Sequence, residues 1–101
     1  MQDDKKDKSK KVNIQIQLDE EIAQGTYVNL AMVNHSETEF TMDFIYVQPQ
    51  QPKAKVRARI ISSPKHTKRL LQALLENVEK FEKRFGTIEL SGPLPQEKLL
   101  H

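Results

Sequence analysis

The chain has 101 residues, of which 37% are hydrophobic and 30% are charged, with a formal net charge of +2 and no cysteine. A chain of this length holds one domain at most, and a domain of this size buries only a modest core. The composition excludes a disulfide framework and thiolate chemistry, and no apolar run approaches the about 20 residues that a membrane-spanning helix needs.

The net charge lies in the N-terminal segment. Residues 1–11 contain five lysines and three aspartates without hydrophobic periodicity, which predicts a disordered basic arm. No apolar stretch follows the initial residues, so we expect no signal peptide and a cytoplasmic location. Residues 91–101 contain two prolines and no periodic pattern, so we expect a flexible tail there. Between these ends, residues 12–90 are predicted to form a single α+β domain.

Four segments of this domain have the pattern of β-strands. Residues 12–18 alternate strictly between apolar and polar side chains, which is typical of a strand with one buried face. Residues 26–33, 39–47 and 53–61 alternate as well or are rich in β-branched and aromatic residues. We therefore predict a four-stranded antiparallel meander sheet, with a fifth strand at 87–90 as an open alternative.

The third and fourth strands suggest a register. Pairing Phe40 with Ile60 aligns large side chains with small ones on one face and places Asp43 opposite Arg57 on the other. Opposite charges directly across a strand pair stabilise a sheet, so we interpret Asp43 as a structural ion-pair partner and not as a general base. In the same scheme, Leu30 of the second strand is expected to share the face of Phe40.

One long helix is predicted after the last of these strands. Ser63 is a favourable N-cap, Pro64 suits the first helical position, and Gly86 stands where a helix commonly ends. Between them, apolar residues recur at spacings of three and four and form one stripe. The stripe consists of Leu70, Leu71, Leu74, Leu75, Val78, Phe81 and Phe85. We expect this helix to pack on one face of the sheet.

No group of residues has the spacing of an active site. His35, His66 and His101 lie in separate predicted segments without metal-ligand spacing, and we interpret them as solvated side chains. The three glycines are too few and too scattered for a phosphate-binding loop. We therefore expect no catalytic residue, no cofactor and no metal site, and a protein that is not an enzyme.

Positive charge is concentrated in residues 53–69, which hold seven basic residues and no acidic one, whereas residues 19–43 hold six acidic residues and neither Lys nor Arg. Free backbone amides at a helix start favour anions, so this region is a candidate anion-binding site. The candidate residues are Lys65, His66, Lys68, Arg69, Arg57 and Arg59. Two interpretations stay open: binding of a polyanion or nucleic acid through 53–69, and neutralisation by the acidic stretch.

A second apolar surface is expected on the sheet face that the helix does not cover. An open apolar face is commonly covered by another chain. The candidate self-association residues are Tyr27, Val33, Ile45, Val47 and Ile61. We therefore predict a non-enzymatic binding or assembly module that acts as a homo-oligomer, with a dimer favoured. Nucleic-acid binding is the alternative but is not favoured, and no membrane association is expected.

Several spaced motifs run through the predicted strands and helix. They are Asn29; Glu39-Phe40-x-x-Asp43-Phe44; Arg59-Ile60-Ile61-x-Ser63-Pro64-x-x-x-Lys68-Arg69-Leu70; and Leu74-x-x-Asn77-Val78-x-x-Phe81-Glu82-x-x-Phe85-Gly86-x-Ile88. In these motifs, over about residues 27–88, the chain resembles an uncharacterised bacterial family, a domain of unknown function of about this length. The resemblance implies no activity, because the family has none assigned.

Overall fold

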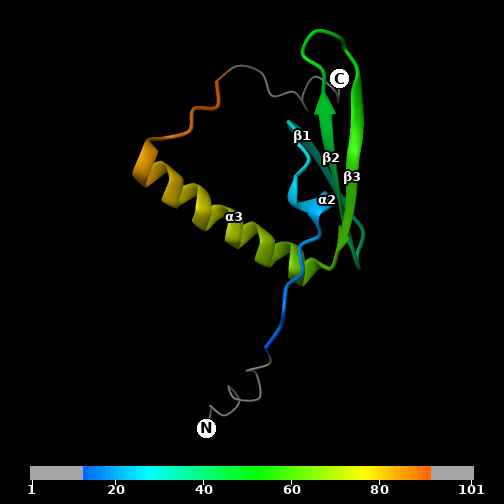
Figure 1. Cartoon of the computed structure of the whole chain (residues 1–101), viewed down its shortest axis with the longest axis vertical. Helices are drawn as coiled ribbons and strands as arrows, with labels where there is room; N and C mark the ends of the chain where they lie inside the picture. The colour runs from blue at the N-terminus through cyan, green and yellow to red at the C-terminus, as the bar shows by residue number, and fades with distance from the viewer. Residues whose placement is uncertain (1–12, 92–101) are drawn as a thin grey trace.

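The computed structural model describes residues 13–91, which form an open antiparallel sheet and one long helix (Figure 1). The elements in chain order are α2 (Glu20–Ala23), β1 (Leu30–His35), β2 (Phe40–Val47), β3 (Ala54–Ser62) and α3 (Pro64–Phe85). The strand order is β1-β2-β3, so the sheet is a meander with two edge strands. The predicted α+β class and the meander order are confirmed.

The sheet has three strands in the described chain, and neither the first predicted strand, at 12–18, nor the possible fifth, at 87–90, is formed among the described residues. Residues 13–18 are in no strand, and Ile16 is 90% exposed. Residues 87–90 are also outside the sheet, where the N–H of Ile88 donates to Oε2 of Glu82 at 3.0 Å. Alternation identifies a segment that can bury one face, but a strand also needs a backbone partner. The predicted arm at 1–11 and nearly all of the predicted tail at 91–101 lie outside the described residues.

Asn29 explains why β1 begins at Leu30, four residues after the predicted start of that strand. The side-chain oxygen of Asn29 accepts from the N–H of Val47 at 2.8 Å, and its side-chain nitrogen donates to the carbonyl of Val47 at 3.1 Å. Its backbone N–H donates to the carbonyl of Ile45 at 3.0 Å. The amide side chain thus occupies the backbone groups of Val47 that an earlier residue would need for pairing.

The register between β2 and β3 differs from the prediction. Ile60 lies opposite Met42, two residues further along β2 than predicted, and Asp43 therefore lies opposite Arg59 and not Arg57. Because a shift of two residues preserves the side-chain faces, Ile60 still shares a face with Met42. The predicted pairing was wrong, but the predicted face of each residue in this part of the hairpin was right.

The loop between β2 and β3 is responsible for this displacement. The N–H of Gln48 donates to the carbonyl of Lys53 at 3.0 Å, so the hairpin is centred between Gln50 and Gln51 and not on Gln50. A β-bulge then adds one more residue on β3. The alternation of apolar and polar residues shows neither which residues close a six-residue loop nor where a bulge lies.

The bulge also changes which side chains of β3 share a face. It lies where Phe44 and Ile45 follow each other on β2, and beyond it Val56 lies opposite Ile45 and Lys55 lies opposite Tyr46. On the Ser62 side of the bulge, Ala58 and Ile60 share the face of Phe44. On the Ala54 side, Val56 lies on the face of Ile45 instead, and Lys55 lies on the face of Phe44.

The two faces of the sheet follow from these pairings, because side chains alternate along each strand. The Phe44 face contains Val33, Phe40, Met42, Phe44, Tyr46, Ala58 and Ile60. The Ile45 face contains Leu30, Asp43, Ile45, Val47, Val56, Arg59 and Ile61. The expectation that Leu30 shares the face of Phe40 was wrong, because the turn between β1 and β2 has an even number of residues, 36–39.

The ends of α3 are as predicted. The side-chain oxygen of Ser63 accepts from the N–H of His66 at 3.1 Å, and Pro64 occupies the first helical position. Gly86 has a φ of 106° and its N–H donates to the carbonyl of Glu82 at 2.9 Å. A positive φ is unfavourable for residues with a Cβ atom, so glycine is suited to ending the helix there.

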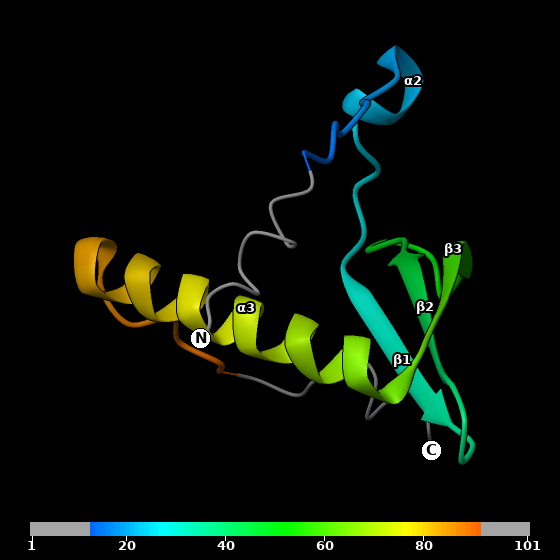
Figure 2. The same cartoon turned by 90° about the horizontal axis from the view of Figure 1, so that it is seen from below.

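The predicted packing of this helix on the sheet was wrong, because α3 runs away from it (Figures 1 and 2). Only its first turns come close, where His66, Arg69 and Leu70 line a shallow pocket with sheet residues. The cause is the connection, since a single residue, Ser63, separates β3 from α3. Ser63 is extended, with φ −72° and ψ 160°, as the residue before a proline prefers. With these angles, the one-residue connection directs the helix away from its own sheet.

The core of the single chain is accordingly small. Within residues 13–91 the buried apolar side chains are those of Leu30 and Met42, each 7% exposed, and Ile45, which is 4% exposed. Most large apolar side chains of the described chain therefore remain at least partly exposed.

Candidate self-association surface

The apolar stripe of α3 is exposed along its whole length. The exposed fraction of its seven side chains ranges from 39% at Val78 to 67% at Phe85. The rings of Phe81 and Phe85 lie 5.0 Å apart between centroids, and the guanidinium of Arg84 lies 5.3 Å from the ring centre of Phe85. An exposed apolar patch of this extent makes α3 a candidate interaction surface.

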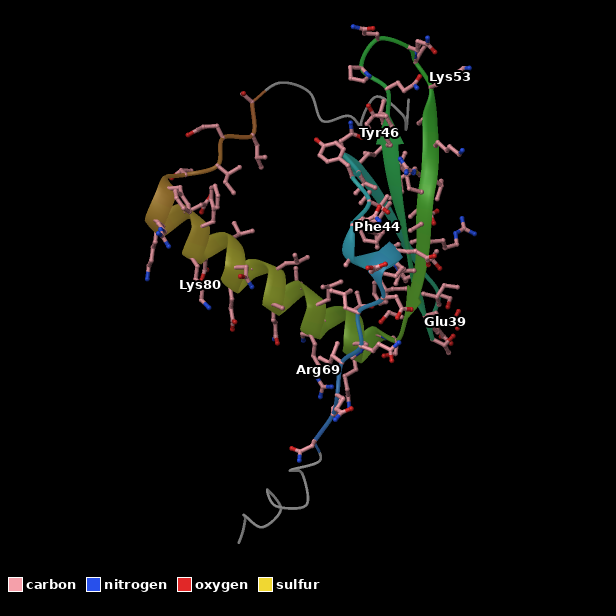
Figure 3. All side chains as sticks on the ribbon, in the orientation of Figure 1. Glu39, Phe44, Tyr46, Lys53, Arg69 and Lys80 are labelled. Atoms are coloured by element: carbon pink, nitrogen blue, oxygen red, sulfur yellow. The ribbon has the colours of Figure 1, made fainter. Side chains whose placement is uncertain are left out.

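The stripe faces the open space between α3 and the sheet. Figure 3 shows Arg69 and Lys80 on the side of α3 that points away from this space. At 100° per residue, both of these positions lie opposite the centre of the stripe. Tyr46 lies on the side of the sheet that is turned toward the helix (Figure 3). The α3 stripe and the side of the sheet that carries Tyr46 thus face each other across this space without contact along most of the helix.

The Phe44 face is the sheet surface on that side. The rings of Tyr27 and Tyr46 meet edge to face with 6.2 Å between centroids, and those of His35 and Phe40 lie 5.4 Å apart. Val33 and Ile60 on this face are exposed. The face is therefore apolar and aromatic, only partly covered by its own chain, and matched in chemistry to the α3 stripe.

The five predicted self-association residues do not share one face. Tyr27, through its contact with Tyr46, and Val33, which pairs with Met42, lie at the Phe44 face. The other three lie on the Ile45 face, where Ile45 itself is buried and Val47 and Ile61 are not. Sequence reasoning missed the α3 stripe as a surface, although its residues were identified, because it assigned the stripe to the core of its own chain.

Asp43 and Arg59 form a bidentate ion pair across β2 and β3. Nε of Arg59 lies 2.7 Å from Oδ1 of Asp43, and Nη2 lies 2.9 Å from Oδ2. The hydrogen bonds from Arg59 lower the pKa of Asp43 below its ordinary value of 3.8, and the same hydrogen bonds raise the pKa of Arg59. The interpretation of Asp43 as a structural partner is consistent with this geometry, although the arginine is a different one.

This pair predicts a pH dependence of stability. A carboxyl group whose pKa is lowered by folding stabilises the protein above its unfolded-state pKa, and that contribution is lost as the pH falls through the folded-state value. We therefore expect the midpoint of urea unfolding to fall more steeply below about pH 4 in the wild type than in Asp43→Asn. Equal pH profiles for the two proteins would show that the pair contributes no stability.

The predicted anion-binding residues are dispersed in the structure. Arg59 is engaged by Asp43, and Arg57 lies in a groove near the β2–β3 loop. His66 and Arg69 lie at the opposite end of the sheet, in the shallow pocket at the start of α3. The remaining two, Lys65 and Lys68, are exposed in the first turns of α3. Segment 53–69 is therefore not one continuous basic stripe.

The groove near the β2–β3 loop has basic and aromatic side chains. It is lined by Tyr46, Gln48, Pro52, Lys53, Ala54, Lys55 and Arg57. Over residues 13–91, no group of three or more His, Cys, Asp or Glu side chains is placed to hold a metal ion. Neither helix of the described segment is long and apolar enough to cross a membrane.

Comparison with known proteins identifies a family without an assigned function. A family model described as a protein of unknown function (DUF3467) matches residues 1–90. No curated protein and no solved structure matches the chain significantly. The family match includes all three strands and α3, and it agrees with the resemblance that the motifs at 27–88 indicate. The chain belongs to the DUF3467 family of proteins of unknown function.

Proposed function

We propose that this protein is a non-enzymatic assembly module that acts as a homodimer, in which the α3 stripe of each copy covers the Phe44 face of the other. The observation that carries the proposal is the exposure of all seven stripe side chains in a single chain. A helix with a polar face and a fully apolar stripe is stable in water only when the stripe is covered. The sheet of the same chain does not cover the stripe, because the connection through Ser63 directs α3 away from that sheet.

The exposed area fits a dimer. At the observed exposures the stripe presents on the order of 700 Å² of apolar surface, close to the about 800 Å² that each partner contributes to a standard interface. In a two-fold arrangement the stripe-to-sheet contact occurs twice, so the buried area doubles. Each stripe then completes the core that its own chain leaves open, and folding and association become one process.

Sedimentation velocity of the full chain at micromolar concentration tests the proposal. We expect a species of twice the chain mass of 11.7 kDa and a thermal midpoint that rises with protein concentration, because association stabilises the folded state by mass action. A monomer that unfolds cooperatively at a midpoint independent of concentration would contradict the proposal.

A second candidate function, binding of a polyanion such as single-stranded nucleic acid, is favoured by one observation. The groove near the β2–β3 loop combines Lys53, Lys55 and Arg57 with the ring of Tyr46, and no acidic residue is among its lining residues in the described chain. Cations that follow a phosphate backbone and an aromatic ring for base stacking are the elements that single-strand binders use.

A titration with a short single-stranded oligonucleotide tests this second function. At low salt we expect the backbone amide signals of Lys53, Lys55 and Arg57 to shift, and we expect the affinity to fall steeply with added salt because binding releases counterions. Lys55→Glu combined with Arg57→Glu should abolish the shifts. Lys65→Glu combined with Lys68→Glu, which changes the charge by the same amount at the distant start of α3, should leave them in place. An absence of shifts at low salt would exclude the site.

A further inference from the structure

We infer that residues 13–18 of one copy add to the outer edge of β1 in the second copy, as a fourth strand of its sheet. This inference rests on the proposed homodimer and assigns a second contact within it. The strand would extend the sheet through backbone hydrogen bonds, whereas α3 would cover its face.

The donated segment has the properties of a strand without a partner. Residues 13–18 alternate strictly, yet they belong to no strand in the described chain. The apolar side chains Ile14, Ile16 and Leu18 are all exposed. The segment ends where the side-chain nitrogen of Gln17 donates to Oδ1 of Asp19 at 2.8 Å, next to the start of α2. Joining the edge of a sheet would cover this apolar side and pair the backbone of the segment at the same time.

The edge of β1 is the better acceptor of the two sheet edges. Residues Leu30–His35 contain no Lys, Arg, Asp or Glu, and in the described chain their outer edge has no strand partner. The other edge strand, β3, carries Lys55, Arg57 and Arg59 and the bulge. Edge charges and bulges are features that prevent strand addition.

The side-chain pattern of the segment also suits this edge. Ala31 and Val33 of β1 lie on the Phe44 face, as their pairing with Phe44 and Met42 shows. A strand added beside them with its apolar side on the Phe44 face would extend the layer that receives α3. The polar side, with Asn13, Gln15 and Gln17, would then lie on the opposite face, where solvent reaches the edge of the sheet.

The connection to β1 favours a second copy over the segment's own chain. Between residues 18 and 30 the chain forms α2, held by the N–H of Ala23 donating to the carbonyl of Asp19 at 2.8 Å. It then turns at Gly25, which has a φ of 80°. Figure 2 shows that α2 lies far out from the sheet, at the end of the segment that leads into β1. The geometry thus presents residues 13–18 away from their own β1, as in an exchange of identical elements between copies.

Site-directed disulfides test the inference, since the natural chain has no cysteine. Full-length chains that carry Gln15→Cys and Asn34→Cys together are oxidised at micromolar concentration and separated under non-reducing, denaturing conditions. Gln17→Cys with Asn34→Cys tests the pairing displaced by two residues. We expect a shift from the monomer mass to covalent dimers in at least one of the two variants, because a disulfide requires Cα atoms within about 7 Å. Gln15→Cys with Arg57→Cys, which probes the edge of β3, should stay at the monomer mass.

The remaining outcomes separate this inference from the homodimer itself. A disulfide that forms within one chain at the monomer mass would show that the strand pairs in its own copy, and strand donation would be wrong. An absence of disulfide in both variants that sediment as dimers would also overturn donation while leaving the homodimer in place. Variants and wild type that all sediment as monomers would contradict the proposed homodimer as well.

Discussion

Leu74→Glu is expected to abolish the homodimer and the cooperative fold of the chain together. Leu74 lies in the middle of the α3 stripe, which the proposed dimer buries against a second sheet. A carboxylate placed there would lose its hydration without gaining a partner, and an unpaired buried charge is among the most costly changes a fold can suffer. A loss of more than about 4 kcal/mol is expected. Sedimentation velocity and circular dichroism at the same concentration measure the two effects.

Gln72→Glu is the matched control for this change. It adds the same charge to the same helix, two residues away and outside the apolar stripe, where the side chain is exposed. A surface substitution of this kind changes stability by no more than about 0.5 kcal/mol, so the variant should remain dimeric and folded. If Leu74→Glu sedimented and unfolded like Gln72→Glu, the stripe would not be an interface.

Ile45→Ala is expected to destabilise the protein by about 2–5 kcal/mol, the cost of removing a large buried aliphatic side chain and leaving a cavity. Ile45 is among the most buried residues of the described chain and lies directly opposite Leu30, so its loss affects both strands of the β1–β2 pair. The midpoint of urea unfolding, measured at one fixed protein concentration, gives the change.

Ile61→Ala provides the comparison for this second prediction. It removes the same atoms from the same face of the sheet, but Ile61 is 57% exposed in the single chain. The cost should therefore be clearly smaller than for Ile45→Ala. An equal cost would mean that another copy covers the Ile45 face as well, as the sequence-based choice of Ile61 as a self-association residue anticipates.

The parts of the fold that local chemistry decides could be predicted from the sequence. The bounds of α3 depend on a side-chain cap at Ser63, a proline at the first position and a glycine that adopts positive φ, all of which act within one turn. The register of β2 with β3 could not be predicted, because it depends on the loop closure between Gln48 and Lys53 and on a bulge. The apolar–polar alternation repeats every two residues, so two registers that differ by two residues fit it equally well.

The residues of the α3 stripe could be predicted from the sequence, but their exposure in the single chain could not. An amphipathic stripe shows that seven side chains of α3 need a cover, but it does not say whether the cover belongs to the same chain. That choice depends on the connection from β3, where one residue precedes a proline. The sequence contains this signal at Ser63 and Pro64, and its consequence becomes visible only when the lengths of both elements are known.

The direction of the long helix α3 relative to the sheet depends on the backbone of one residue, Ser63, which is bonded to the first turn of the helix. The carbonyl of Ser63 accepts from the N–H of Thr67 at 2.9 Å and from the hydroxyl of Thr67 at 2.8 Å, in addition to the cap by its own side chain. At 1.5 Å per residue, α3 is about 33 Å long, so a rotation of only about 10° at Ser63 would displace the far end of the helix by about 6 Å. The φ and ψ angles of this single residue thus determine where the distal part of the stripe, with Phe81 and Phe85, is presented to another copy.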